Sequence, residues 1–256
     1  MPELPDVEGL RILFKRHASG KKVKGVSVES DIVRNCRPQA LGRALRDRRF
    51  KDPTRWGKWL LCPTGGPTLV LHFGMTGALI WSGDEPERHE HDRMFITLAD
   101  GELRYRNMRK LGGVWLAPTE ADIEGITGPL GPDAYEISKR EFLRSLEGRS
   151  GSIKATLMNQ RFVAGLGNLT VDETLWQARV APKRPVGSLD EQEASALYVK
   201  MRKVLKESMQ VGRVPGKTTW ITGARDRDSS CPRCGTRLKR TKVGGRTTYW
   251  CDNCQS

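Results

Sequence analysis

The first residues of the chain, MPELPDVEGL, place a proline and a carboxylate side by side at Pro2 and Glu3. If Met1 is removed, the α-amino group of Pro2 becomes a candidate nucleophile, because such a group titrates near ~7.7–8 and is partly uncharged at neutral pH. A secondary amine of this kind could form a covalent adduct, and the Glu3 carboxylate could act beside it as a general acid. The alternative is structural, since proline also favours the first turn of a helix. These residues alone leave both interpretations open.

Cysteines near the end of the chain predict a metal site. The motifs CPRC and CDNC are separated by sixteen residues, and such pairs in a basic protein favour zinc over disulfides. Four thiolates leave no open position for water, so we expect one structural Zn2+ per chain. A hairpin turning at Gly244-Gly245 would bring the pairs together, and its basic side chains suit contact with DNA. The alternative is a zinc site that only stabilises the C-terminus. The predicted ligands are Cys231, Cys234, Cys251 and Cys254.

The overall charge indicates a polyanionic partner. The 256 residues carry 44 Lys and Arg against 30 Asp and Glu, a net charge of +14, and nucleic acid is the first candidate. A membrane-surface protein is disfavoured because no basic amphipathic helix has a bulky apolar face. No apolar run is long enough to cross a bilayer. The acidic start lacks a signal-peptide pattern, so we expect a cytoplasmic, nucleoid-associated protein.

Two kinds of secondary structure must position these residues. Residues 1–20 carry an apolar helical stripe, and residues 22–115 hold short β-branched and aromatic runs cut by turns such as ADGE, which predicts a β-sandwich or small barrel. The second half has helical spacing, with AGLGN between two short helices. A glycine turn of this kind can direct backbone amides at phosphate. Residues 133–138 are the expected linker between the halves.

Four motifs in chain order are PELPDVE, then GKWLL with HFGMTG, then AGLGN, then the CxxC pairs ending in WCDNCQS. Together they resemble the formamidopyrimidine-DNA glycosylase and endonuclease VIII family, and the opening PELP is closer to the formamidopyrimidine side. The resemblance implies an α+β fold in three parts. These are a catalytic helix and β-sandwich domain over 1–132, a helix–two-turn–helix domain over 133–220, and a zinc-finger hairpin over 221–256.

The resemblance also implies an activity. We expect a bifunctional DNA glycosylase and AP lyase that flips and excises a damaged base, then cleaves the strand by β,δ-elimination through an N-terminal proline Schiff base. Its partner would be damaged double-stranded DNA, and the protein would be a monomer. The resemblance assigns Pro2, Glu3 and Lys58 to catalysis, His72, Lys154, Asn168 and Arg246 to DNA contacts, and Met75, Arg109 and Leu111 to the space left by the flipped base and to the opposite base.

Some positions depart from the family pattern. Asp6 replaces a glutamate, Leu111 stands where a phenylalanine is usual, and NLTVDETL lacks the usual aromatic after the asparagine, although Glu173 is in place. Only ITGARDRDSS separates GKTTW from CPRC, where 8-oxoguanine enzymes have a longer flap. We therefore expect a more open lesion pocket and a preference for ring-opened, oxidised or bulky lesions over 8-oxoguanine.

Two other classes of protein compete with this interpretation. One is a non-catalytic relative that binds damaged DNA, which would retain Met1 or carry an inactive Pro2. The other is a zinc-ribbon RNA-binding or ribosome-associated protein, which leaves PELPDVE and HFGMTG without a role. The segment RHEHD, with His89, Glu90 and His91, lacks HExxH spacing, and we expect a polar loop there with no metal. A core histidine is the alternative for His72, and core packing is the alternative for Met75 and Leu111.

Overall fold

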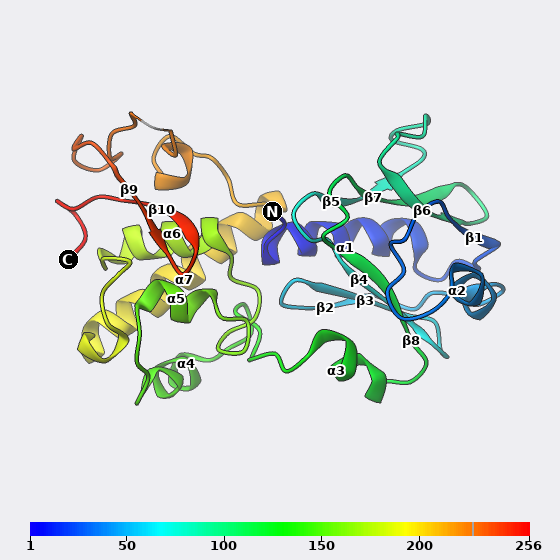
Figure 1. Ribbon diagram of the computed structural model, residues 1–256, viewed down its shortest axis with the longest axis horizontal. Coiled ribbons are helices and arrows are strands. Elements are labelled where there is room, and N and C mark those ends of the chain that lie inside the picture. Colours follow the sequence, from blue (N-terminus) through cyan, green and yellow to red (C-terminus); the bar gives the residue numbers. More distant parts are fainter. Residues whose placement is uncertain (227) are drawn as a thin grey trace. The chain divides into compact units, whose positions relative to one another are not determined.

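The computed structural model describes residues 1–226 and 228–256, which form two compact units (Figure 1). The first unit comprises residues 1–2 and 6–129, and the second comprises residues 3–5 and 130–256. Residues 4 and 5 therefore begin the chain's first helix, Glu3 directly precedes it, and all three pack with the second half of the chain. The predicted domain boundaries near 132 and 220 stay predictions.

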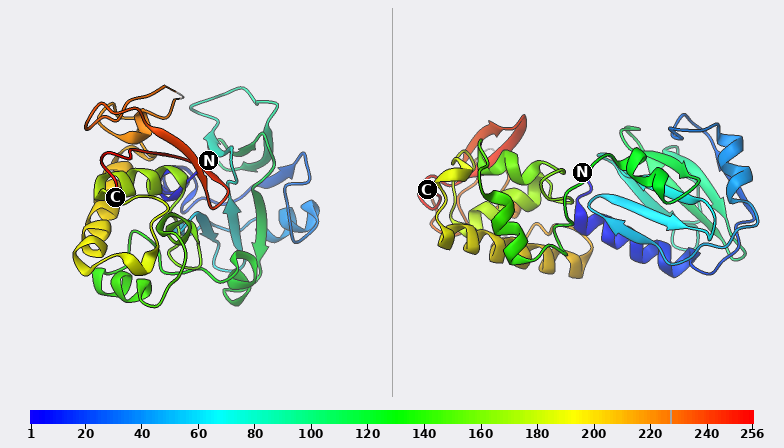
Figure 2. Two further views of the ribbon diagram at one scale, coloured as in Figure 1. Left: turned by 60° about the vertical axis from the view of Figure 1, so that its left-hand side comes forward. Right: turned by 90° about the horizontal axis from the view of Figure 1, so that it is seen from below.

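The first unit is a β-sandwich with the N-terminal helix packed against it (Figure 2). One antiparallel sheet has the order β1-β6-β7-β5 and the other has the order β2-β3-β4-β8. The predicted ADGE turn joins β6 to β7, where the Leu98 amide donates to the Gly101 carbonyl at 2.9 Å. The strands are β1 (Gly25–Val28), β2 (Thr54–Trp56), β3 (Trp59–Pro63), β4 (Thr68–His72), β5 (Gly77–Trp81), β6 (Asp92–Thr97), β7 (Glu102–Asn107) and β8 (Gly113–Ala117).

Helix α1 (Leu4–Ala18) closes the core of this unit. It buries Val7, Phe14 and Ala18 completely among strand residues such as Leu71 and Met94. The spacing of these helix residues puts them on one face, which is the amphipathic arrangement that the apolar stripe predicts. Two further helices of the unit are α2 (Pro38–Leu45) and α3 (Ala121–Thr127).

The second unit begins with helices and ends with a hairpin. Ser138 and Ser152 cap the first two helices by accepting from backbone amides three residues on, and Asp190 forms a capping box with Glu193 at the start of the longest one. Hairpin β9–β10 turns at Gly244 and Gly245, which both adopt positive φ as predicted. The elements are α4 (Lys139–Leu146), α5 (Ile153–Met158), α6 (Asn168–Ala178), α7 (Glu191–Val211), β9 (Lys239–Val243) and β10 (Arg246–Trp250), with short 3-10 turns at Val186–Ser188 and Ile221–Gly223.

The segment expected as a linker is part of this unit's core. Ala134 and Ile137 are buried among core side chains, and the Ala134 amide donates to the Ala164 carbonyl at 2.9 Å. The linker prediction for 133–138 was therefore wrong. The stretch contains many polar residues, but its apolar residues pack in the core and its backbone pairs with the AGLGN motif. The predicted α+β fold, with a sandwich rather than a barrel, is confirmed.

Candidate functional site

The carboxylate of Glu3 is seated on the first turn of α6. Its side chain is buried, and the amides of Leu169 and Thr170 donate to its two oxygens at 2.8 and 3.0 Å. The Thr170 hydroxyl adds a third hydrogen bond at 2.7 Å. A helix N-terminus presents unpaired amides and a positive dipole end, so it stabilises and orients a carboxylate.

The AGLGN motif makes room for this arrangement. A Cβ on Gly167 would lie 2.1 Å from Cδ of Glu3, and a Cβ on Gly165, whose φ is +111°, would lie 2.5 Å from a methyl of Leu4. The Leu4 amide also donates to the Gly165 carbonyl at 3.1 Å. We expected the amides of this turn to face phosphate. In the structure the amides of Leu169 and Thr170, which directly follow the motif, bind Glu3 instead, because residues 3 and 4 reach into the turn.

Pro2 precedes this fixed carboxylate directly in the chain. It is half-buried, whereas Met1 is 41% exposed. Met1, which must be removed, is thus accessible. Pro2, whose amine its removal would release, is the residue next to Glu3. Asp6, the shortened carboxylate, lies in the first turn of α1.

Lys154 and Asn168 form a buried network instead of a free surface. Nζ of Lys154 donates to Asn168 at 2.7 Å, to Asp172 at 2.5 Å and to Thr248 at 2.7 Å, and its side chain is fully buried. Asn168 also donates to the Thr247 carbonyl at 2.9 Å. The predicted direct DNA contact of Lys154 is therefore not available in this conformation, since its three protons already have acceptors.

In the first unit, Lys58 and His72 lie close enough to interact. Lys58 is half-buried in the turn between β2 and β3, and His72 ends β4 with its ring 4.7 Å from that of Trp59. Nδ1 of His72 accepts from the Gly74 amide at 3.2 Å. Burial, and then the charge of Lys58, lowers the pKa of His72 to about 4. A neutral ring whose Nδ1 accepts a hydrogen bond carries its proton on Nε2, so it can donate a hydrogen bond there but carries no positive charge.

The structure brings the candidate wedge residues onto two adjoining loops. Met75 is half-buried in the β4–β5 loop, while Arg109 is exposed and Leu111 is 55% exposed in the β7–β8 loop. The Arg109 amide donates to the Thr76 hydroxyl at 3.1 Å. A Cβ on Gly74 would lie 2.4 Å from the Gly112 amide nitrogen, so the glycine of HFGMTG permits the close approach of the loops. Leu111 is not a core residue.

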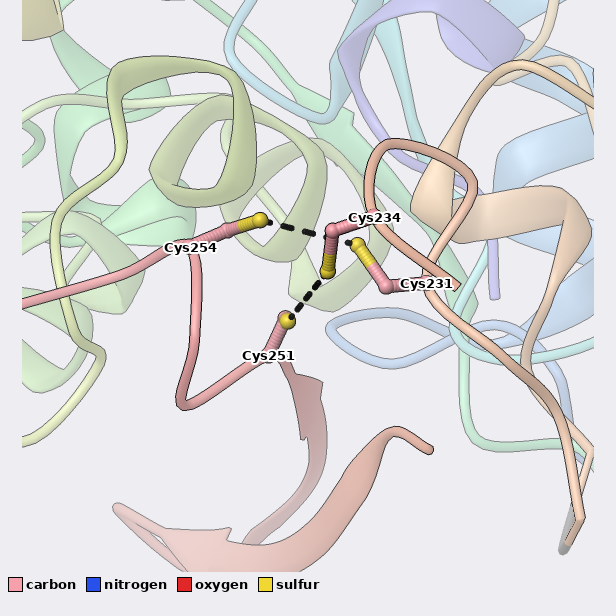
Figure 3. A group of neighbouring side chains, drawn as sticks. All are labelled: Cys231, Cys234, Cys251 and Cys254. Carbon is pink, nitrogen blue, oxygen red and sulfur yellow. Dashed lines mark hydrogen bonds between the residues drawn. The ribbon is translucent and has the colours of Figure 1, made fainter. Parts of the chain in front are cut away.

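The cysteine pairs converge as predicted, and Figure 3 shows their four sulfurs pointing toward one centre. All four lie within 4.8 Å of one another. A tetrahedron with Zn–S bonds of about 2.3 Å has edges of about 3.8 Å, so the cluster fits zinc with little adjustment. The indole N–H of Trp176 donates to the sulfur of Cys231 at 3.3 Å, a contact that orients a ligand from outside the cluster.

Arg246 follows the hairpin turn as the first residue of β10 and is exposed. Within the part of the chain that the structure describes, its guanidinium has no ion pair. Lys239, Arg240 and Lys242 add charge along β9. The hairpin tip therefore presents cations to solvent, as its sequence indicated.

Sequence reasoning missed three residues that complete the site, and it named a fourth, Glu173, without identifying its contacts. Asp172 and Glu173 are buried on α6, and Thr222 and Arg225 bind them from the short segment that precedes the zinc ribbon. Two adjacent acids in a helix that also carries Thr170 were the available signal. Their partners lie about fifty positions away, so spacing could not identify them.

Comparison with known proteins agrees with this arrangement. Residues 1–114 match the formamidopyrimidine-DNA glycosylase N-terminal domain, residues 130–219 match the H2TH domain of the same glycosylase, and residues 229–256 match a zinc finger found in FPG and IleRS. A formamidopyrimidine-DNA glycosylase of Pelotomaculum thermopropionicum is 34% identical, over 100% of this chain and 99% of the relative. The chain belongs to the formamidopyrimidine-DNA glycosylase family. The same enzyme of Lactobacillus delbrueckii is 33% identical, over 100% of this chain and 99% of its own length.

Solved structures of family members have the same fold. The formamidopyrimidine-DNA glycosylase of Lactococcus lactis, bound non-covalently to DNA with an AP site, is 28% identical with a TM-score of 0.87, covering 99% of each chain. A MutM protein in complex with DNA containing carbocyclic 8-oxo-G is 27% identical with a TM-score of 0.89, covering 100% of each chain.

Membership in the glycosylase family confirms the main predictions. The chain is a DNA glycosylase with AP lyase activity, so the enzymatic interpretation holds against the non-catalytic alternative. Its four-cysteine cluster is a structural Zn2+ site. Among the described residues, no helix is both long and apolar enough to cross a membrane.

Proposed function

We propose that this glycosylase removes oxidised and ring-opened purines from damaged double-stranded DNA through a Schiff base on Pro2. The observation that carries the proposal is the seat of Glu3, whose carboxylate is fixed by three donors beside the candidate nucleophile. A group held in one orientation loses little entropy when the reaction begins. The protein would act as a monomer.

The reaction follows from the chemistry of a secondary amine. Once Met1 is removed, the lone pair of the Pro2 nitrogen attacks C1′, and the N-glycosidic bond breaks with its electron pair leaving on the base, which takes up a proton. Glu3 accepts the proton that the new ammonium loses and passes it to the ring oxygen, which opens the sugar to an iminium ion. Loss of a C2′ proton then expels the 3′ phosphate, a second proton loss expels the 5′ phosphate, and hydrolysis releases Pro2.

Contacts to DNA come from both units in this proposal. Lys58 and Arg246 pair with phosphates, and His72 donates as a neutral ring. Asn168 and Lys154 support the phosphate-binding side indirectly, by holding the hairpin that carries Arg246. Met75, Arg109 and Leu111 fill the stack and face the opposite base, a role that suits the exposure of the latter two.

The segment before the zinc ribbon bears on which lesions the enzyme prefers. Residues 221–226 pack on α6 through Ile221, Thr222 and Arg225, so this short segment is already engaged within the second unit. A family member has been solved with N7-benzyl-Fapy-dG in its DNA, which is a bulky ring-opened lesion. We therefore favour ring-opened or bulky purines over 8-oxoguanine.

Borohydride trapping tests the nucleophile. Protein whose N-terminus is confirmed by mass spectrometry as Pro2 should form a covalent complex with AP-site DNA, and peptide mapping should place the adduct on Pro2. A Pro2→Gly variant should retain part of the lyase activity, because a primary amine still forms an imine. Absence of a trapped complex with Met1 confirmed absent would contradict the proposal.

A matched panel of duplexes tests the lesion. Excision should be faster for Fapy-dG and N7-substituted Fapy-dG than for 8-oxoguanine in the same sequence opposite cytosine. Selective and rapid removal of 8-oxoguanine would contradict the proposed preference and would leave the Schiff-base chemistry intact.

A further inference from the structure

The second turn of α6 carries two adjacent acids that bind the segment before the zinc ribbon. Asp172 forms ion pairs with Lys154 of α5 and with Arg225 of the segment. Glu173 accepts from the amide of Thr222 at 3.2 Å, at the 3-10 turn of the same segment. Both acids are buried, so these bonds are shielded from water.

The same carboxylates and cations also hold the zinc hairpin, which lies against α6 within this unit (Figure 1). Arg225 donates to the Thr247 carbonyl at 3.3 Å and lies 4.9 Å from the ring centre of Tyr249. The Tyr249 amide donates to Asp172 at 3.4 Å. Segment, hairpin and helix therefore share one polar cluster, which we call the α6 clamp: Lys154, Asp172, Glu173, Thr222 and Arg225.

The clamp is continuous with the seat of Glu3. Asn168 accepts from Lys154, and the next two residues of the helix, Leu169 and Thr170, hold the Glu3 carboxylate. A shift of α6 would move both ends together, because the residues that hold Glu3 and the two acids of the clamp belong to one continuous helix.

The opposite charges of the clamp hold its side chains together. Burial lowers the pKa of Lys154 and raises the pKa of Asp172, while their mutual attraction opposes both shifts. Arg225 adds a second positive charge beside Asp172, which also opposes the rise in the pKa of this carboxyl group. Loss of one partner from a buried pair leaves an uncompensated charge, which is costly.

We propose that Asp172 is a positioning residue whose clamp on Arg225 keeps residues 221–226 fixed, so that this side of the site is preformed instead of being assembled by closure of a lid. The inference rests on the proposed function for its kinetic consequence but not for its structural one. Preformed groups spare the enzyme the entropy of ordering them after DNA binds.

Arg225→Gln is the first test, since it breaks the clamp and leaves the buried Lys154–Asp172 pair intact. Hydrogen exchange on the free protein should show protected amides at Thr222, Gly223 and Ala224 in the wild type and about tenfold faster exchange in the variant. Arg225→Lys should restore most of the protection. The matched control is Arg237→Gln, which breaks the exposed Arg237–Asp228 pair nearby and should change nothing.

The rate of single-turnover excision distinguishes a positioning role of the clamp from a purely structural one, which would leave this rate unchanged. Arg225→Gln should slow excision at saturating DNA about tenfold, with Arg225→Lys close to wild type, while the Kd for undamaged duplex changes less than threefold. A Lys154→Met/Asp172→Leu variant removes both members of the fully buried pair and leaves only the partly exposed Arg225 without its carboxylate. Adding Arg225→Gln to it should cause no further loss.

Rapid exchange at 222–224 in the free wild-type protein, or additive effects of the Arg225→Gln and Lys154→Met/Asp172→Leu changes, would overturn the inference. Exchange in the free protein does not depend on catalysis. Failure of the clamp is therefore distinguishable from failure of the Schiff-base proposal, which borohydride trapping reports.

Discussion

Glycine at position 167 is required because any side chain there would occupy the place of the Glu3 carboxylate. The added Cβ of Gly167→Ala would lie 2.1 Å from Glu3 Cδ, and neither the backbone turn nor the buried carboxylate can give way by that amount. We expect the variant to lose at least about a hundredfold in single-turnover excision, the lower range for a lost acid–base group. Gly187→Ala is the control, since its nearest neighbour is at 3.8 Å. Full activity of Gly167→Ala would contradict the assigned role of Glu3.

Glu173 makes stability depend on pH near neutrality. Burial raises its pKa from 4.5 to about 7 in the folded chain. Its contribution is therefore fully present below pH ~4.5 and is lost as the pH rises through about 7, a change of about 3 kcal/mol in the free energy of unfolding. Glu173→Gln should remove this slope when urea unfolding is compared between pH 5 and 8. Exposed Glu141→Gln is the matched control, and an unchanged slope in Glu173→Gln would refute the assignment.

At the scale of the element, helix α6 both packs against the zinc ribbon and orients one of its zinc ligands. The Trp176 indole N–H donates to the sulfur of Cys231. The Arg233 guanidinium lies over the same ring, 4.3 Å from its centre. Trp176→Phe keeps an aromatic ring at this position and removes the N–H, so zinc affinity should fall about tenfold or more, as for other groups that orient metal ligands. Chelator competition measures this. Trp220→Phe, an equally buried indole, should bind zinc as the wild type does.

The helices, strands and turns of this fold were the features most readily predicted from the sequence. Short runs of β-branched and aromatic residues cut by turns indicated the strands, and Gly244-Gly245 indicated the hairpin turn, because both patterns reflect local backbone geometry. Residues 133–138 were assigned wrongly. Their polar members suggested a linker, while the burial of Ala134 and Ile137 depends on partners that local pattern does not identify.

At the scale of the whole molecule, the net charge of +14 predicts steeply salt-dependent DNA binding. Arg246→Ala should weaken binding to all duplexes alike and reduce the slope of log K against log salt by about 1, because one phosphate contact is lost. Lys206→Ala removes the same charge from exposed α7 and should leave the slope nearly unchanged. Equal slopes for wild type and Arg246→Ala would show that the arginine does not contact phosphate.

The amino-acid sequence by itself determined the ligands of the zinc site, the order of sandwich and helices, and the pairing of Pro2 with Glu3. Each depends on residues that are neighbours in the chain or on spacing set by one element. Only the tertiary structure decided where Glu3 is held and what Lys154 contacts. Glu3 binds an amide 166 positions away, and Lys154 binds a hydroxyl 94 positions away. Such contacts follow from how elements pack, and neither residue type nor periodicity encodes them.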